Sequence, residues 1–158
     1  MITTVQKILA CQFPACAEQM GNVRHQLREA LGPSGQPEAV VNHLVLAVGE
    51  ACMNIIQHAY GPHDKGDILL EVEIQNVEIQ KGEAKTAPEG GIWQRTLVFR
   101  LTDFALHKTC AEQMRSRPLD EIRPGGLGCH IINEVMDEVI LLDRQGGPGN
   151  VLELRKRL

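Results

Sequence analysis

The sequence predicts an α/β two-layer sandwich, in which a mixed, largely antiparallel sheet is covered on one face by three helices. Two observations lead to this class. A sustained apolar pattern with helical period occupies residues 41–59, and two alternating strand patterns that are suited to pair as a long hairpin follow it. The chain has 158 residues, enough for one core. We therefore expect a single domain over residues 1–158.

The first half of the chain reads as strand, helix, helix. Residues rich in β-formers fill positions 2–12, and Pro14 then opens an amphipathic pattern that ends at Gly32 and Pro33. After this break, apolar residues recur at helical spacing through residues 41–59, until Gly61 and Pro62 stop the pattern.

The second half is mostly strand. The run ILLEVEIQNVEIQ after Asp67 alternates as a half-buried strand does, and IWQRTLVFRLTD is its expected hairpin partner. Residues 104–125 have no stable period, so we expect a long mobile segment with a function. The segment GGLG leads into a predicted helix, CHIINEVMDE, and the strands VILLD and NVLELRKRL flank the turn RQGGPG.

Composition excludes several classes of function. The formal net charge is -4 and aromatic residues make up only 3%, so we expect no nucleic-acid partner. No stretch approaches the about 18 consecutive apolar residues of a membrane helix, and we expect no membrane partner. The five cysteines are odd in number and include no CxxC pair, which favours a reducing cytoplasm.

Three polar residues interrupt the apolar helix at intervals of four. Glu50, Asn54 and His58 form one slanting stripe, because positions four apart differ by only about 40° around a helix. A solvated face is the simpler interpretation. However, Asn is a poor residue for a helix interior, and a carboxylate and an amide one turn apart suit a site for magnesium and phosphate.

Two further segments carry candidate ligand-binding residues. Gly125, Gly126 and Gly128 lie directly ahead of a predicted helix, whose exposed N-terminal N–H groups favour anions. The alternative interpretation is that these glycines only mark the point where the helix begins. Asp103 ends the strand LVFRLTD, and it is either a strand terminator or an acceptor for the exocyclic amine of adenine.

Taken in order, EACMNIIQHAY, LTDFA and GGLGCHIINEVMDEV resemble the three nucleotide-binding boxes of the GHKL (histidine kinase-like) ATPase superfamily. The match is closest to the anti-sigma factor serine/threonine kinases of bacterial partner-switching systems. It covers nearly the whole chain and implies the Bergerat ATP-binding fold. It also implies transfer of the γ-phosphoryl group of ATP, with magnesium, to a serine or threonine of a small anti-anti-sigma antagonist protein.

The resemblance implies a role for each matching residue. Glu50 would be the base toward the attacking hydroxyl, Asn54 would hold magnesium, and Asp103 would accept the adenine amine. Residues 104–125 would form a lid, in which Arg115, Arg117 or Arg123 would offset charge on the phosphoryl group. The residues expected at the nucleotide are Asn54, His58, Asp103, Ala105, Gly125, Gly126, Leu127 and Gly128. A sigma factor as second partner and a homodimer are likewise implied.

Three alternatives compete with this interpretation. The family carries glycine where Ala105 stands, which favours a module that sequesters a sigma factor or antagonist and binds nucleotide weakly or not at all. A sensor histidine kinase fragment would use His25, but only about 28 residues separate it from Asn54, too few for the required helical hairpin. A zinc site could be built from His107 and Cys110 with His58 or His63, although no paired ligand spacing supports it.

Overall fold

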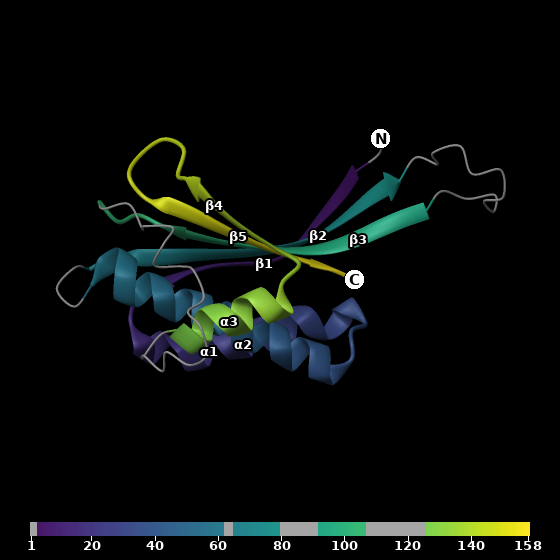
Figure 1. The fold of residues 1–158 in the computed structure, drawn as a ribbon, viewed down its shortest axis with the longest axis horizontal. Coiled ribbons are helices and arrows are strands. Elements are labelled where there is room, and N and C mark those ends of the chain that lie inside the picture. The colour runs from purple at the N-terminus through teal and green to yellow at the C-terminus, as the bar shows by residue number, and fades with distance from the viewer. Residues whose placement is uncertain (1–2, 62–64, 80–91, 107–125) are drawn as a thin grey trace.

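The computed structural model describes residues 3–61, 65–79, 92–106 and 126–158. Within them, five strands form one sheet in the order β1-β2-β3-β5-β4, and every neighbouring pair is antiparallel. The helices α1, α2 and α3 all lie on one face of this sheet (Figure 1). The predicted two-layer α/β sandwich is therefore confirmed. The described sheet is wholly antiparallel rather than mixed, because β5 turns back from β4 and runs against β3.

The elements have the following bounds. The strands are β1 (Thr3–Pro14), β2 (Asp67–Ile79), β3 (Ile92–Asp103), β4 (Glu138–Asp143) and β5 (Asn150–Arg157). The α-helices are α1 (Met20–Leu31), α2 (Glu38–Ile55) and α3 (Gly126–Val135). Short 3-10 turns η1 (Ala17–Gln19) and η2 (Gly32–Ser34) flank α1, and the π-helical turn η3 (Ile56–Tyr60) continues α2.

Each expected strand and helix is present, but both ends of the last helix are misplaced in the prediction. We placed the start of the last helix after its glycines, whereas α3 begins at Gly126 and ends at Val135. Gly126 and Gly128 therefore belong to its first turn, where the N–H groups have no partner within the helix. The helix stops before Glu138 because that residue already pairs with β5.

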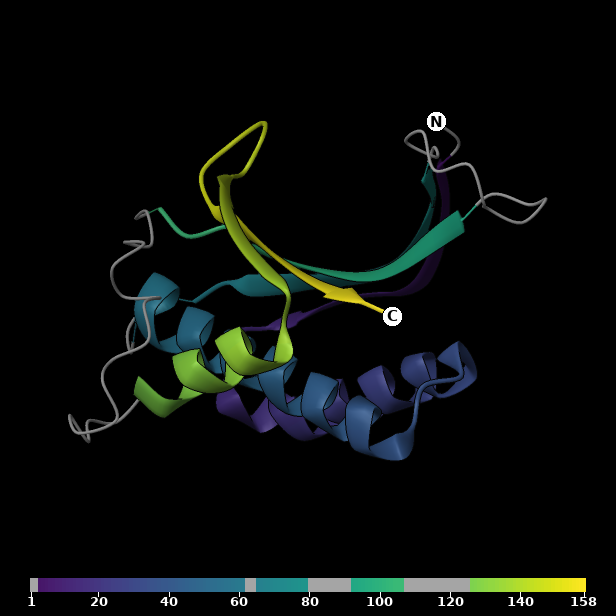
Figure 2. The same ribbon diagram turned by 45° about the vertical axis from the view of Figure 1, so that its right-hand side comes forward.

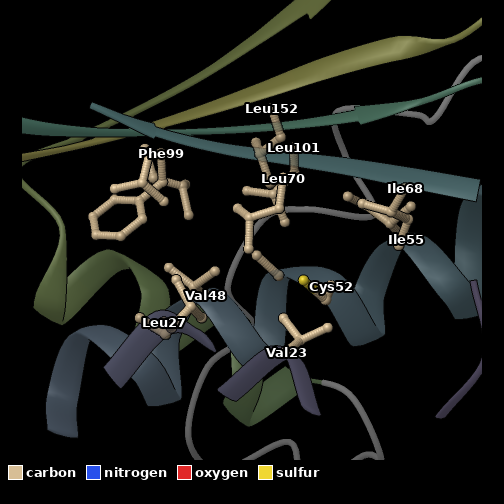
Figure 3. Close-up of a cluster of buried hydrophobic side chains, with 14 of the residues drawn as sticks. Val23, Leu27, Val48, Cys52, Ile55, Ile68, Leu70, Phe99, Leu101 and Leu152 are labelled. Atoms are coloured by element: carbon tan, nitrogen blue, oxygen red, sulfur yellow. The ribbon is translucent and has the colours of Figure 1, made fainter. Parts of the chain in front are cut away.

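The core lies between the sheet and the helices and is mainly aliphatic. Alternate residues of β2 and β3 point toward the helices, as a strand period of two requires. Figure 3 shows Ile68 and Leu70 of β2 and Phe99 and Leu101 of β3 facing the side chains of α1 and α2. Among them, Ile55 of α2 lies beside Ile68, at the end of the sheet where β3 finishes.

The central helix is more apolar than we expected. The span Glu38–Tyr60 contains an 18-residue window with a mean hydropathy of 1.6, so by length and composition it would qualify as a membrane span. Our expectation that no segment approaches this character was too strict. Half of that window is buried inside the fold, because Leu44, Val48, Cys52 and Ile55 pack into the core.

The other face of the sheet carries no helix in the described part of the chain. The sheet bends away from the helices at both ends, so this outer face is concave (Figure 2). Arg100 of β3 crosses it between Glu73 of β2 and Glu153 of β5, with N–O distances of 2.9 Å to each. At the edge strand β1, the pairing with β2 shifts register between Lys7 and Leu9.

Candidate functional site

Glu50, Asn54 and His58, the polar stripe along α2 and η3, differ in how deeply they are buried. Asn54 is only 3% exposed, Glu50 is half-buried, and His58, in η3, is exposed. A simple water-facing stripe would expose all three side chains. The burial of Asn54 rules out the solvated-face interpretation for that residue.

The buried Asn54 amide faces the first turn of α3. Its Nδ2 atom donates a hydrogen bond to the sulfur of Cys129, at 3.7 Å, across a sequence separation of 75 residues. Cys129 is itself 3% exposed. The helix that carries the stripe and the glycine-rich segment therefore meet in space, as the candidate site requires.

Glu50 approaches the same turn of α3. A Cβ atom added at Gly128 would lie 2.7 Å from Glu50 Oε2, which is closer than real Cβ contacts allow. We expected Gly128 to make room for a ligand, and in the structure the room it leaves borders the Glu50 carboxylate. A side chain at position 128 would push the end of the flexible Glu50 side chain aside, because α3 packs this closely against α2.

Asp103 points toward the helices from the end of β3. It continues the inward series Leu97, Phe99 and Leu101, each two residues apart, and it is only 2% exposed. The strand register places it opposite Ile68, which lies beside Ile55 of α2 (Figure 3). A strand terminator facing solvent is therefore not what the structure shows.

Backbone and side-chain donors hold the Asp103 carboxylate. Its Oδ1 accepts bonds from Ala105 N–H at 3.1 Å, Asn150 N–H at 3.2 Å and Asn150 Nδ2 at 3.4 Å. In the described residues, Oδ2 receives only a 3.4 Å bond from Asn150 Nδ2. Burial raises the pKa of Asp103 above its ordinary value, and the hydrogen bonds from Ala105 and Asn150 act in the opposite direction. One carboxylate oxygen is thus anchored while the other keeps acceptor capacity.

Asn150 is a site residue that the sequence did not single out. It opens β5 next to Asp103, and the preceding Gly149 has a φ of +127°. A Cβ at Gly149 would lie 2.0 Å from the Asp103 carbonyl oxygen. The only signal in the sequence was the glycine-rich turn GGPG before an asparagine, and that pattern also fits an ordinary hairpin turn.

Tyr60 is a second residue that the sequence analysis missed. Its hydroxyl donates to the Asp67 carbonyl oxygen at 2.5 Å and accepts from the Phe104 N–H at 2.8 Å. Gly66 allows this approach, since a Cβ there would lie 2.2 Å from the Tyr60 ring. Tyr60 therefore ties the end of the α2–η3 helix to the backbone immediately after Asp103.

Several predicted site residues lie outside the described part of the chain. They are Arg115, Arg117, Arg123 and Gly125, together with residues 107–125 of the expected lid. The proposed zinc ligands His63, His107 and Cys110 lie outside it as well. Gly126 and Leu127 are described as the first two residues of α3. The described structure stops at Leu106, three residues after Asp103, and resumes at Gly126, where α3 begins. The first turn of α3 then brings Gly128 beside Glu50 and Cys129 beside Asn54.

A separate groove does not coincide with these residues. It has a volume of about 430 Å³ and lies between the first half of α2 and the second half of α3. Its lining is Val40, His43, Leu44, Leu46, Ile131, Glu134, Val135 and Lys156. None of the predicted site residues belongs to it, so it is not the candidate site.

His25 does not belong to the candidate site. Its side chain is 70% exposed on α1 and lies 3.3 Å from Glu29 one turn later. This is an ordinary surface position. The interpretation as the phosphoacceptor of a sensor kinase gains no support from this position.

Comparisons with known proteins find one matching family and several relatives. The family described as "Histidine kinase-like ATPase domain" matches residues 13–156. The serine-protein kinase RsbW of Bacillus velezensis is 28% identical over 147 residues, covering 92% of this chain and 84% of the relative. RsbW of Bacillus subtilis is 27% identical over 136 residues, covering 85% and 78%. RsbW of Bacillus pumilus is 28% identical over 132 residues, covering 84% and 76%.

Proposed function

Because the chain belongs to the histidine kinase-like ATPase family, we propose that it is an ATP-dependent serine/threonine protein kinase that phosphorylates a small antagonist protein. The names of its relatives, serine-protein kinases, support this activity. The observation that carries the proposal is the meeting of α2 and α3. Asn54 contacts Cys129, and Glu50 borders Gly128. The first and third sequence boxes, EACMNIIQHAY and GGLGCHIINEVMDEV, therefore lie next to each other.

The donor set fits ATP with magnesium. When bound, ATP and magnesium supply the transferable phosphoryl group and the positive charge that offsets its phosphates. The Asn54 side-chain oxygen is a ligand of the hard type that magnesium prefers. The first turn of α3 offers backbone N–H groups for the phosphates, and Gly126 and Gly128 keep side chains away from them.

Glu50 is the proposed general base. Its carboxylate is half-buried on α2, one turn before Asn54, and it borders the start of α3. From there it accepts the proton of the attacking serine or threonine hydroxyl. One of the arginines 115, 117 and 123 would offset charge on the transferring group.

Asp103 is the proposed specificity residue for adenine. Its Oδ1 is anchored by Ala105 and Asn150, whereas Oδ2 keeps the capacity to accept the exocyclic amine. A fixed acceptor at this point distinguishes adenine from guanine, which carries a carbonyl oxygen there. His58 and Ala105 complete the proposed set at the nucleotide.

The partners follow from the same family membership. We propose an anti-anti-sigma protein as the substrate, a sigma factor as the second partner, and a homodimer as the assembly. The proposed location is the cytoplasm, with neither nucleic acid nor membrane as a partner.

Phosphoryl transfer tests the proposal directly. The protein is incubated with γ-labelled ATP, magnesium and anti-anti-sigma proteins from the same organism, and label on serine or threonine is measured. Glu50→Gln should lower the transfer rate about 10²–10⁴-fold and leave ATP affinity almost unchanged. The matched control is Glu29→Gln, because Glu29 is 71% exposed on α1 and away from the site. Full transfer by Glu50→Gln would refute the role of the base.

A non-catalytic sequestering module is the second candidate. Ala105 favours it, because this alanine is 5% exposed and its N–H is bound to Asp103 at the proposed adenine pocket. Stable capture of the sigma factor or antagonist without label transfer would support the module. Ala105→Gly should then raise ATP affinity if the methyl group is the obstacle.

A further inference from the structure

We propose that Cys129 is a positioning residue for magnesium binding: its sulfur holds the Asn54 amide in the orientation that presents the side-chain oxygen to the metal. This inference rests on the proposed function and deepens it. It assigns a purpose to a buried thiol in the first turn of α3.

The contact joins two elements at the centre of the candidate site. Asn54 Nδ2 lies 3.7 Å from Cys129 Sγ, within the range of a hydrogen bond to sulfur. Both residues are 3% exposed, so solvent competes little for either group. The first turn of α3 therefore supplies the acceptor, and α2 supplies the amide.

An asparagine amide has two nearly isosteric ends with opposite chemistry. The oxygen accepts hydrogen bonds and ligates hard cations, whereas the NH₂ group only donates. A rotation of 180° exchanges them. In a buried position, an NH₂ group without an acceptor is costly. An acceptor on one side of the amide therefore attracts the NH₂ group and turns the oxygen to the opposite side.

The thiol is the acceptor in this structure, and the oxygen is left available. No donor among the described residues reaches Asn54 Oδ1. In that part of the chain, no fully buried side-chain nitrogen or oxygen lacks a partner, so Oδ1 itself is not fully buried. The oxygen is therefore the polar end of Asn54 that remains open to a ligand. The sulfur fixes this orientation without competing for magnesium, because soft sulfur is a poor ligand for a hard cation.

Magnesium-linked ADP binding measures this effect separately from catalysis. Calorimetry gives the ADP affinity in magnesium chloride and in EDTA, and the ratio of the two is the magnesium gain. The proteins are wild type, Cys129→Ala, Cys129→Ser and Cys52→Ala. Cys52 is the matched control, because it is a fully buried thiol on the apolar side of α2, in the core between that helix and the sheet.

We expect Cys129→Ala to reduce the magnesium gain about three- to tenfold, the size of one lost hydrogen bond. Its ADP affinity in EDTA should stay within about twofold of wild type. Cys129→Ser should restore most of the gain because a hydroxyl also accepts. Cys52→Ala should lower the melting temperature and leave the gain unchanged.

Three results would overturn the inference. An unchanged gain in Cys129→Ala would show that the thiol does not orient the amide. An increased gain would show that the thiol donates to the oxygen and blocks it. Loosened packing would explain the loss if Cys129→Ser does not restore the magnesium gain. The same holds if Cys52→Ala reduces the gain as much as Cys129→Ala does. If wild type itself shows no magnesium gain, the proposed metal role of Asn54 fails first, and the inference fails with it.

Discussion

Gly149 shows how one residue without a side chain shapes the candidate site. Its φ of +127° disfavours any L side chain, and a Cβ would collide with the Asp103 carbonyl oxygen. Because Asn150 follows directly, the bond from Asn150 N–H to Asp103 depends on this close approach.

Gly149→Ala should therefore destabilise the fold by about 3 kcal/mol or more, since strain and steric overlap add. Gly146→Ala is the matched control in the same turn. Its φ is also positive, at +85°, but nothing lies within 4 Å of its added Cβ, so only about 1–2 kcal/mol is expected. Chemical denaturation of both variants measures the difference, and equal costs would contradict the steric argument.

At the scale of elements, the outer face of the sheet couples three strands through charge. The bond from Arg100 is the main cause that lowers the pKa of Glu73. A carboxylate with a lowered pKa stabilises the fold above its ordinary pKa of 4.5, and this contribution is lost as the pH falls through the lowered value.

The free energy of unfolding should accordingly fall by about 1–3 kcal/mol in Glu73→Gln at pH 7. The difference from wild type should shrink as the pH is lowered below about 4.5. Glu71→Gln is the control on the same strand and face. Its pair with Lys7 is more exposed, so its removal should cost about 0–1 kcal/mol. Urea titrations from pH 3 to pH 7 test this, and a difference that does not change with pH would refute it.

The elements themselves were largely predictable, whereas their contacts were not. Alternation in β2 and β3 and the apolar period of α2 are local patterns, and they predicted these elements closely. Asn54 stood out because asparagine is a poor residue inside a helix. Cys129, Asn150 and Tyr60 gave no such signal, because each acquires its role only when segments 75, 47 and 44 residues apart meet.

At the scale of the whole molecule, ligand binding and folding are linked. A ligand that binds only the folded protein stabilises it by about 2.7 kcal/mol at 100 times its dissociation constant, which is roughly 5–10 °C for a domain of this size. ADP with magnesium should produce such a shift in the melting temperature. GDP with magnesium should not, because the proposed acceptor Asp103 would face the carbonyl oxygen of guanine in place of the amine of adenine. A scan of thermal unfolding with both nucleotides decides this, and equal shifts would contradict the role of Asp103.

The register shift in β1 bears on how the molecule avoids edge-to-edge aggregation. As the outermost strand, β1 presents backbone donors and acceptors along its open side, where another extended chain could dock. The break between Lys7 and Leu9 interrupts that row. A second strand could not pair in one register along the whole edge, because the segments before and after the shift are offset from each other. This edge of the sheet therefore disfavours fibril growth.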